Sequence, residues 1–332
     1  MITIEYLETE EAVYDITVED NHNFYANGLL VHNCSEITLY CDEEYSFSCV
    51  LSSMNCTRYD EWKDTDAVFN SLVFLDCVNQ DLIESGKNIP GLEKVIKFAT
   101  ASRALGLGVL GFHTYLQDKS IPFESFDAYL KNLDVFQYLH NETLRASEYL
   151  AKEYGEPDWC TGYGVRNTHR IAIAPNLSSS NFSGGVSQGI EPIYKNAYVQ
   201  DTSAGKMNRI NPSLLTIMKE RGVYNEDTIK SIIINKGSVQ QVDWLNEHEK
   251  EVFKTAFEIS QYQIIKLAAA RQKYIDQAQS INLFFSADET EQNIAAVHKH
   301  AFKNPDIKSL YYIRTESGVL KSNKQECIAC EA

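Results

Sequence analysis

The chain has 332 residues, 44% hydrophobic and 23% charged, a composition typical of a globular protein with one large domain and a small one. Its formal net charge of −16 argues against a nucleic-acid-binding surface. No apolar run approaches the ~18 residues of a membrane helix, and the first residues lack the basic stretch of a secretory signal. We therefore expect neither a nucleic-acid partner nor a membrane.

Residues 1–33 carry seven Asp and Glu residues and no Lys or Arg. They include two β-like stretches, at 2–6 and 12–18, and a predicted tight turn at Asn27-Gly28 followed by apolar residues 29–31. So few strands make a small all-β piece that cannot stand alone. One interpretation is a solvated hairpin. The other is an incomplete domain that awaits a basic partner.

The order and spacing of three motifs in this segment resemble the two C-terminal blocks of an intein: 13–18 (VYDITV), 22–25 (HNFY) and 27–34 (NGLLVHNC). Because Met1 lies just upstream, the segment resembles the C-terminal half of a split intein. The implied fold is a horseshoe-shaped, Hint-type all-β domain. The N-terminal intein half, on a separate chain, would complete it.

This resemblance implies a splicing role for each matching residue. Asn33 would attack its own backbone carbonyl and break the Asn33–Cys34 bond, while His32 would donate a proton to the scissile amide. Cys34 would capture the acyl group from the partner chain. Asp15 and His22 would be supporting groups, although His22 alone also fits a histidine in a turn.

The stretch from Tyr45 to Ser53 is predicted to be a strand, because Tyr45, Phe47, Cys49 and Leu51 alternate on one face. Helices are predicted at 66–79 and 91–105, and the clearest amphipathic helix at 126–153. The glycines of 104–112 (ALGLGVLGF) lack a dinucleotide-binding context. They are typical of a close-packed passage from a strand to a helix.

Further along, a short apolar strand is predicted at 171–175, and helices at 247–259 and 261–275. A segment at 276–285 ends as a strand, and a helix at 289–302 leads to a strand at 309–313. This strand–helix–strand order favours parallel pairing. The tail from Thr315 is polar, and we expect it to be mobile.

A serine- and glycine-rich stretch, 176–185 (NLSSSNFSGG), follows the predicted strand that ends at Pro175. Loops of this composition past a strand end bind phosphates in α/β proteins, through backbone N–H groups and hydroxyls. The alternative is a flexible polar loop. The anion-binding interpretation makes Pro175, Ser178, Ser179 and Ser180 candidate binding residues.

Residues 34–332 resemble the C-terminal half of a class I ribonucleotide reductase large subunit. The matching features, in chain order, are Cys34-x-Glu36, Cys49, 166–169 (RNTH), 174–180 (APNLSSS), 187–192 (SQGIEP), 278–284 (AQSINLF), Tyr311-Tyr312 and the pair Cys327/Cys330. The implied fold is α/β: the second half of a ten-stranded barrel with a catalytic finger loop.

The resemblance assigns chemistry to these residues. Cys34 would carry the thiyl radical that abstracts the ribose 3′ hydrogen, and Glu36 would be the general base on the 3′ hydroxyl. Cys49 would be one of two thiols that reduce the 2′ position. Tyr311 and Tyr312 would relay the radical, although two adjacent tyrosines alone also fit a packed core. The serines would hold the substrate diphosphate.

The terminal pair Cys327/Cys330 would reduce the active-site disulfide again and accept electrons from thioredoxin or glutaredoxin. Half of an intermolecular metal site is the alternative, since no second cysteine or histidine pair completes a zinc site. No metal is expected in this chain. The radical would come from a separate metal-containing small subunit.

The sequence departs from the reductase pattern just before Cys34, where His32 and Asn33 replace the family's Asn-Leu. The second reducing cysteine, the allosteric regions and half of the barrel are also absent. The sequence therefore predicts a precursor with an intein fragment at 1–33, a half-barrel at 34–314 and a redox tail at 315–332. Trans-splicing to an N-terminal fragment would give an enzyme that reduces ribonucleoside diphosphates.

Two other interpretations stay open. An adenosylcobalamin-dependent reductase would need no relay tyrosines, and an inert half-barrel could carry a degraded intein. Eight cysteines without a secretory signal favour reduced thiols, and therefore a cytoplasmic location. If the protein is viral, this would be the cytoplasm of the infected host cell.

Overall fold

The computed structural model describes residues 23–26, 29–32, 35–202 and 205–315. Near its start, β1 (Asn23–Ala26) pairs with β2 (Leu29–His32) in an antiparallel hairpin. This register agrees with a tight turn between them, although Asn27 and Gly28 lie outside the described residues. The β-like stretches predicted at 2–6 and 12–18 also lie outside them.

Five extended segments lie side by side in the large domain that follows. β3 (Leu51–Asn55) is parallel to β4 (Gly106–Leu110). On its other side, β4 is hydrogen-bonded to the 169–173 segment, since Leu105 N donates to His169 O (2.9 Å) and Leu107 N to Arg170 O (2.8 Å). That segment meets 277–280 through a parallel bridge between Ile173 and Gln279.

The last two strands of the sheet are β7 (Leu283–Phe285) and β8 (Ile313–Thr315), which are parallel to each other. The residues preceding each strand are bonded too, since Tyr311 N donates to Ile281 O (2.8 Å) and Leu283 N to Tyr312 O (2.9 Å). Within the described part of the chain, the order across the sheet is therefore 51–55, 106–110, 169–173, 277–285 and 311–315.

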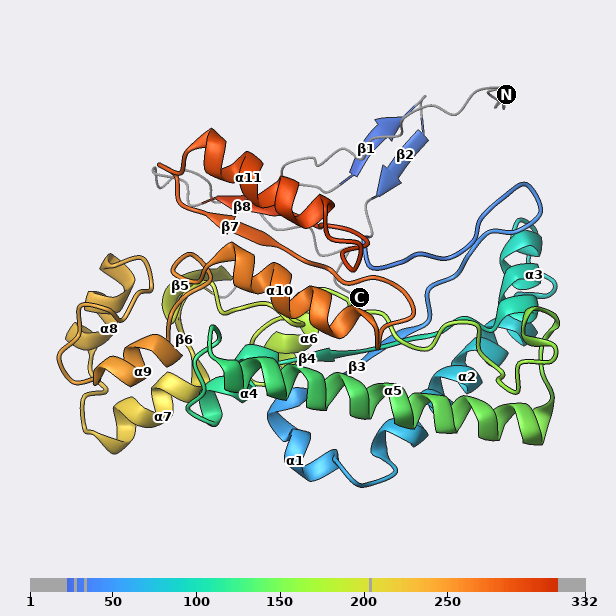
Figure 1. Cartoon of the computed structure of the whole chain (residues 1–332), viewed down its shortest axis with the longest axis horizontal. Coiled ribbons are helices and arrows are strands. Elements are labelled where there is room, and N and C mark those ends of the chain that lie inside the picture. Colours follow the sequence, from blue (N-terminus) through green and yellow to red (C-terminus); the bar gives the residue numbers. More distant parts are fainter. Residues whose placement is uncertain (1–22, 27–28, 33–34, 203–204, 316–332) are drawn as a thin grey trace.

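Helices cover this sheet, as Figure 1 shows. They are α1 (Tyr59–Trp62), which follows the short η1 (Cys56–Arg58), then α2 (Ala67–Gly86), α3 (Glu93–Ser102), α4 (Phe112–Asp118), α5 (Phe126–Tyr154), α10 (Gln261–Gln272) and α11 (Glu291–Phe302). The short η2 (Asp158–Cys160) follows α5.

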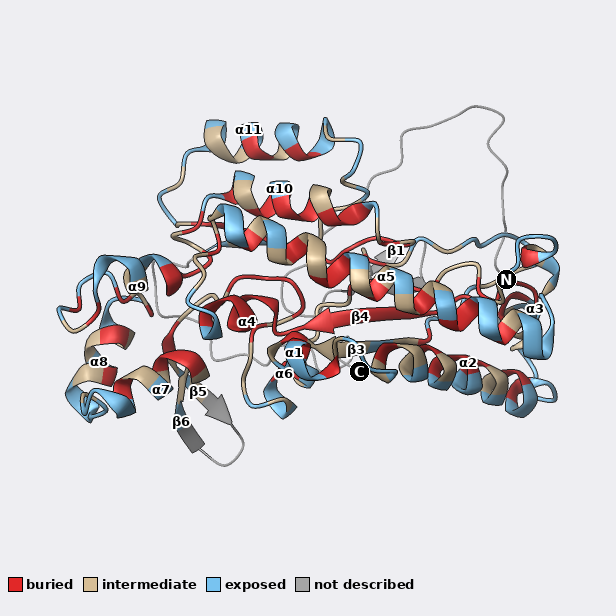
Figure 2. Cartoon of the chain, turned by 60° about the horizontal axis from the view of Figure 1, so that its bottom comes forward, coloured by how far each residue is buried: buried red, intermediate tan, exposed pale blue. Residues whose placement is uncertain are grey.

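The long helix α5 shows why these sequences fold locally. Ser125 caps its N-terminus, with Oγ accepting from Ala128 N (3.1 Å), and Gly155 ends it with a left-handed φ of 83°. Its buried side chains recur every three or four residues, and Figure 2 shows them as a red stripe along the helix. Val135, Phe136 and Leu139 belong to the main core cluster.

Glycines in β4 allow two extended segments to approach closely. A Cβ on Gly108 would lie 2.5 Å from Ala172 O, and one on Gly106 would lie 2.9 Å from Ala172 Cβ. Since backbone atoms cannot move aside cheaply, only glycine fits at 108. This confirms the prediction of a close-packed strand-to-helix passage at 104–112.

A second, smaller core lies to one side of the sheet and was not predicted. β5 (Ala197–Thr202) and β6 (Gly205–Ile210) form an antiparallel hairpin, followed by α7 (Pro212–Glu220), α8 (Glu226–Ile234) and α9 (Glu247–Val252). Their apolar residues form a separate cluster that includes Leu214, Met218, Ile232, Val239 and Phe253.

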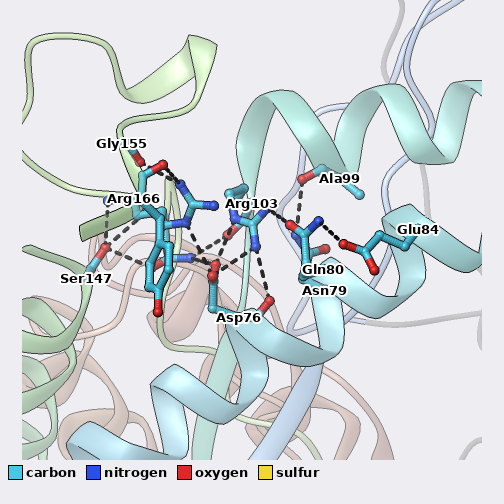
Figure 3. Close-up of polar contacts among 11 residues, drawn as sticks. Asp76, Asn79, Gln80, Glu84, Ala99, Arg103, Ser147, Gly155 and Arg166 are labelled. Carbon is cyan, nitrogen blue, oxygen red and sulfur yellow. Dashed lines mark hydrogen bonds and ion pairs between the residues drawn. The ribbon is translucent and has the colours of Figure 1, made fainter. Parts of the chain in front are cut away.

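A buried ion-pair network ties α2 to α5 and the β4 edge (Figure 3). Asp76 accepts from Arg103 Nε and Nη2, both at 2.9 Å, and from Arg166 Nε at 3.3 Å. Asn167 Nδ2 donates to Asp76 Oδ1 (3.0 Å), and Ser147 Oγ donates to Asn167 Oδ1 (2.8 Å). Two guanidinium groups therefore share one carboxylate inside the protein.

We expect Asp76→Ala to lower the free energy of unfolding of the full chain by about 3–5 kcal/mol, because it leaves the buried Arg103 and the half-buried Arg166 without their counter-charge. Thermal and urea denaturation would measure this loss. Asp81→Ala is the matched control, since Asp81 lies on the same helix but is exposed. Equal stability of the two variants would contradict the structural role of the network.

Most predicted helices are confirmed, with shifted ends. α2 extends beyond 79 to Gly86, while α9 stops at Val252 instead of 259. There Ala256 N donates to Ile193 O (2.8 Å), a tertiary contact that takes the chain out of the helix. The parallel pairing of the last two strands is also confirmed.

Three strand predictions need correction. The strand predicted at 45–53 begins at Leu51, because its partner β4 starts only at Gly106 and gives the preceding residues little to pair with. The 171–175 stretch makes one isolated bridge instead of a regular strand. The last strand is Ile313–Thr315, not 309–313. Among the described residues, no helix is long and apolar enough to span a membrane.

Candidate active site

Glu36 is a buried carboxyl at the start of the large domain, with 4% of its surface exposed. Its Oε2 accepts a hydrogen bond from Ser280 Oγ (2.9 Å), and its main-chain O accepts from Ala278 N (3.0 Å). These two bonds tie residue 36 to an extended segment 244 positions along the chain. Next to it, Ser309 Oγ donates to Ser35 O (2.7 Å), so the residues just before the last segment of the sheet also hold this part of the chain.

Burial raises the pKa of the Glu36 carboxyl, although hydrogen bonds from its own backbone and from Ser280 partly oppose the shift. A raised pKa makes the carboxylate a stronger base than an exposed glutamate. Its chemistry therefore fits the general base predicted from the sequence.

Tyr311 and Tyr312 lie together at the far edge of the same sheet. Their ring centroids are 3.8 Å apart with an interplanar angle of 41°. Tyr312 is 8% exposed and Tyr311 is half-buried. Adjacent residues in a strand normally point to opposite faces. Their rings meet here because β8 begins only at the next residue, Ile313.

Glu191 is a second buried carboxyl near this edge, and the sequence analysis did not assign it a role. Its Oε1 accepts from Asn282 Nδ2 (2.7 Å), and Asn282 Oδ1 accepts from Tyr312 N (2.9 Å). Burial raises the pKa of Glu191, while the positive charge of Arg314 and the Asn282 bond lower it in part. Asn282 therefore connects Glu191 to the backbone of the tyrosine pair.

The serine-rich stretch is a short helix, α6 (Leu177–Phe182), and not the predicted loop. Asn176 precedes it with a left-handed φ of 63°, and its Nδ2 donates to Ala174 O (2.9 Å) and to Val109 O (3.3 Å) of β4. The first helical hydrogen bond runs from Ser180 N to Asn176 O (2.9 Å). The earlier amides of the helix therefore lie at its N-terminal end, where anions are favoured.

The four candidate binding residues differ in exposure. Ser179 is exposed, Pro175 and Ser178 are half-buried, and Ser180 is buried. Ser180 Oγ donates to Leu177 O (2.8 Å), so this hydroxyl stabilises the helix. A pocket of about 270 Å³ lies beside α6, and its lining includes Ser180, Gly184, Gly185, Glu191, Tyr194 and Arg209.

The structure brings some of the predicted residues close together and leaves others apart. Glu36 and the tyrosine pair are bonded to the same segment, 277–285, which also meets the extended segment that leads to Pro175. Cys49 lies at the opposite side of the sheet, two residues before β3, and its side chain is exposed. Cys49 therefore precedes the first extended segment of the sheet, whereas Glu36 is bonded to the fourth.

Several predicted residues fall outside the described part of the chain. These are Asp15, His22, Asn33, Cys34, Cys327 and Cys330, and for His32 only the backbone, in β2, is described.

Two motifs contain candidate functional residues that the sequence analysis did not assign. Glu191 lies in 187–192 (SQGIEP), and Ser280 and Asn282 lie in 278–284 (AQSINLF). Their spacing of two in an extended segment was the available signal.

Comparisons with known proteins agree with this geometry. The model of the family "Ribonucleotide reductase, barrel domain" matches residues 17–162 and 158–313. The large subunit of ribonucleoside-diphosphate reductase from Invertebrate iridescent virus 6 is 41% identical over 308 residues, which cover 91% of this chain and 32% of that protein. A putative large subunit from Frog virus 3 is 38% identical over 309 residues, 90% of this chain and 54% of that protein.

A solved structure shows the same fold. The class Id ribonucleotide reductase alpha subunit of Actinobacillus ureae superposes with a TM-score of 0.80 at 44% identity, covering 86% of this chain and 52% of that one. The fold is thus that of an α/β barrel domain found in a reductase subunit. The chain belongs to the ribonucleotide reductase family, within the barrel domain of the large, or alpha, subunit.

The chain spans between about a third and about a half of the length of these relatives. The family match begins at residue 17, upstream of the boundary at 33/34 that the intein motifs predict.

Proposed function

We propose that residues 34–314 form the second half of a ten-stranded barrel in a class I ribonucleotide reductase large subunit, with 315–332 as its redox tail. Joined to the first half, this part would reduce ribonucleoside diphosphates to deoxyribonucleoside diphosphates. The observation that carries the proposal is the shared attachment of Glu36 and of the Tyr311–Tyr312 pair to one segment, 277–285. The family match over the same residues supports it.

The proposed roles follow the sequence motifs. Cys34 bears the thiyl radical that takes the 3′ hydrogen of the ribose, and Glu36 accepts the proton of the 3′ hydroxyl. The raised pKa of Glu36 supports this role, because the group must take up a proton during the reaction. Cys49 is one of the two thiols that reduce the 2′ position. The exposed position of Cys49 fits a side chain that the first half of the barrel would cover.

The substrate diphosphate is proposed to bind at the N-terminal end of α6, with Pro175, Ser178, Ser179 and Ser180 around it. The first-turn amides and the serine hydroxyls are donors, and the end of the helix dipole favours negative charge. The exposed Ser179 offers its hydroxyl to a ligand more readily than the buried Ser180, whose hydroxyl donates to Leu177 O.

The radical is proposed to arrive from a separate small subunit that holds the metal, through Tyr312 and then Tyr311. The described residues contain no group of three or more His, Cys, Asp or Glu side chains arranged to hold a metal ion. Cys327 and Cys330 would return electrons from thioredoxin or glutaredoxin to the active-site disulfide. The reaction would take place in the cytoplasm, and the viral relatives support the proposal that this is the cytoplasm of an infected cell.

We further propose that residues 1–33 are the C-terminal half of a split intein. The support is the joint match of three motifs and the antiparallel register of β1 and β2 on either side of Asn27-Gly28. The start of the family match at residue 17 competes with this boundary. His32, Asn33 and Cys34 carry out the cleavage and ligation, with Asp15 and His22 in support. The partner is an N-terminal large-subunit fragment that carries the other intein half.

Co-expression with that N-terminal fragment, followed by intact-mass measurement, tests the splicing proposal. We expect a ligated product that contains residues 34–332 and lacks 1–33. Asn33→Ala should abolish it by blocking the cyclisation that releases the intein, and Cys34→Ala should abolish it by removing the acyl acceptor.

Asn27→Ala is the matched control, because it changes a nearby asparagine of the same segment that has no proposed role in bond breakage. A soluble, associated pair that gives no ligated mass would contradict the splicing proposal. The reductase proposal would stand apart from that result, since residues 34–332 can be joined genetically to the first half of the barrel.

A further inference from the structure

Glu191 is a buried carboxyl for which the proposed reaction provides no role. It is 7% exposed, and it lines the pocket beside α6. Burying a carboxylate is costly unless hydrogen bonds or charges compensate it. Its side chain accepts a hydrogen bond from Asn282 Nδ2 (2.7 Å) and faces the positive charge of Arg314. Because burying this carboxylate costs free energy, we expect its function to lie in the group that it binds, Asn282.

The Asn282 side chain is held in one orientation by its two partners. Its Nδ2 can only donate, and the carboxylate of Glu191 accepts from it. Its Oδ1 can only accept, and the N–H of Tyr312 donates to it (2.9 Å). A flip of the amide would break both hydrogen bonds at once. Glu191 therefore fixes the group that holds the backbone of Tyr312.

The tyrosine pair is held along its main chain by the same segment. Tyr311 N donates to Ile281 O (2.8 Å) and Leu283 N donates to Tyr312 O (2.9 Å). With Asn282 between them, three consecutive residues thus bind the backbone of Tyr311 and Tyr312. The two neighbouring bonds are main-chain bonds that any sequence could make. The Asn282–Glu191 pair is the part that depends on side chains.

Arg314 completes the surroundings of the pair. Its Cζ lies 5.8 Å from the centroid of the Tyr312 ring, and its charge acts on Glu191. Arg314 therefore lies near the Tyr312 ring and also balances part of the charge of Glu191. A transfer of electrons between two rings is sensitive to their separation, which is 3.8 Å between centroids.

We propose that Glu191 and Asn282 are positioning residues for the Tyr311–Tyr312 pair, and that they set the ring geometry needed for radical relay. The proposal rests on the proposed relay function of the two tyrosines. Glu191 acts through Asn282 and contributes no proton or electron of its own.

The test uses residues 34–332 joined genetically to the first half of the large subunit and assayed with the small subunit. Glu191→Leu removes the acceptor for Asn282, and losing one such buried hydrogen bond should lower turnover by about tenfold or more. Glu191→Gln should restore most of the turnover, because the glutamine Oε1 still accepts from Asn282. Asp118→Asn is the matched control, because this carboxyl also accepts a side-chain hydrogen bond, from Ser213 Oγ (2.6 Å), at the contact of α4 and α7 and away from the tyrosine pair.

Two readouts separate positioning from plain stability. With 3-aminotyrosine at position 312, electron paramagnetic resonance should show a reduced radical yield in Glu191→Leu and an unchanged yield in Asp118→Asn. Hydrogen exchange of the Tyr312 amide should accelerate at least severalfold in Glu191→Leu alone, while other amides of β7 and β8 keep their rates.

The outcomes separate the two proposals. If Tyr312→Phe abolishes turnover while Glu191→Leu changes neither turnover nor radical yield, the positioning proposal is wrong and the relay stands. If Tyr312→Phe leaves turnover intact, the relay itself is wrong, and the positioning proposal fails with it. A loss in Glu191→Leu that Glu191→Gln does not restore would also overturn the positioning proposal.

Discussion

Replacing Tyr312 by Phe should lower nucleotide reduction by about a thousandfold or more, equivalent to at least ~4 kcal/mol of barrier. Phenylalanine keeps the ring and its packing but has no phenolic O–H to oxidise. Tyr312 is buried against Tyr311 with ring centroids 3.8 Å apart, so the substitution should leave the fold intact. The measurement is deoxynucleoside diphosphate formation by the joined large subunit with its small subunit.

Tyr163→Phe is the matched control, because this tyrosine is 79% exposed and lies far along the chain from the proposed relay. We expect its turnover to equal that of the unmodified enzyme. Unchanged turnover in Tyr312→Phe would favour the adenosylcobalamin-dependent alternative, which needs no relay tyrosine. Loss of activity in both variants would point to a general defect of the preparation.

Glu36→Gln should lower turnover by about 10²–10⁴-fold, the usual contribution of a general base. The amide keeps a hydrogen-bond acceptor for Ser280 but cannot take up the proton of the 3′ hydroxyl. The measurement is turnover across pH, where the variant should also lose the acidic limb of the profile. Glu43→Gln serves as the control from the same segment, since Glu43 is exposed. Full activity of Glu36→Gln would rule out Glu36 as the general base.

The same variant should be more stable than the unmodified chain at neutral pH. Burial raises the pKa of Glu36 in the folded state, so folding works against its charged form. The contribution of Glu36 to the free energy of unfolding is greatest below its ordinary pKa. This contribution is lost as the pH rises through the raised pKa of the folded state. Melting curves should therefore show a gain for Glu36→Gln at pH 7 that shrinks toward pH 4. A gain that is constant with pH would contradict this origin.

Much of the fold could be predicted from the sequence where a local pattern decides the structure. The helix at 126–153 matched α5 because apolar spacing, the Ser125 cap and Gly155 agree with one another. The glycine passage at 104–112 was also correct. Its cause was invisible, however, because the backbone of Ala172 that excludes a side chain at Gly108 lies far away in the sequence.

Other features depend on partners that one sequence does not reveal. The strand around Cys49 was placed too early, because alternation cannot say where β4 begins to offer hydrogen bonds. The serine stretch became a short helix, since Asn176 takes a left-handed conformation held by the carbonyls of Ala174 and Val109. Glu191 was missed for a similar reason: its partner Asn282 is 91 positions away.

The large sequence separation between Glu36 and its hydrogen-bond partner Ser280 has a consequence for the order of folding. Its hydrogen bond to Ser280 closes a loop of 244 residues, and the bond from Ser309 to Ser35 O closes a longer one of 274. Contacts of such high sequence separation form late, because closing a long loop costs chain entropy before any contact rewards it. During synthesis, neither bond exists until the ribosome has passed residue 280. Ser35 and Glu36 should therefore stay without these two tertiary hydrogen bonds through most of translation, and they become fixed only when the last segments of the sheet have been made.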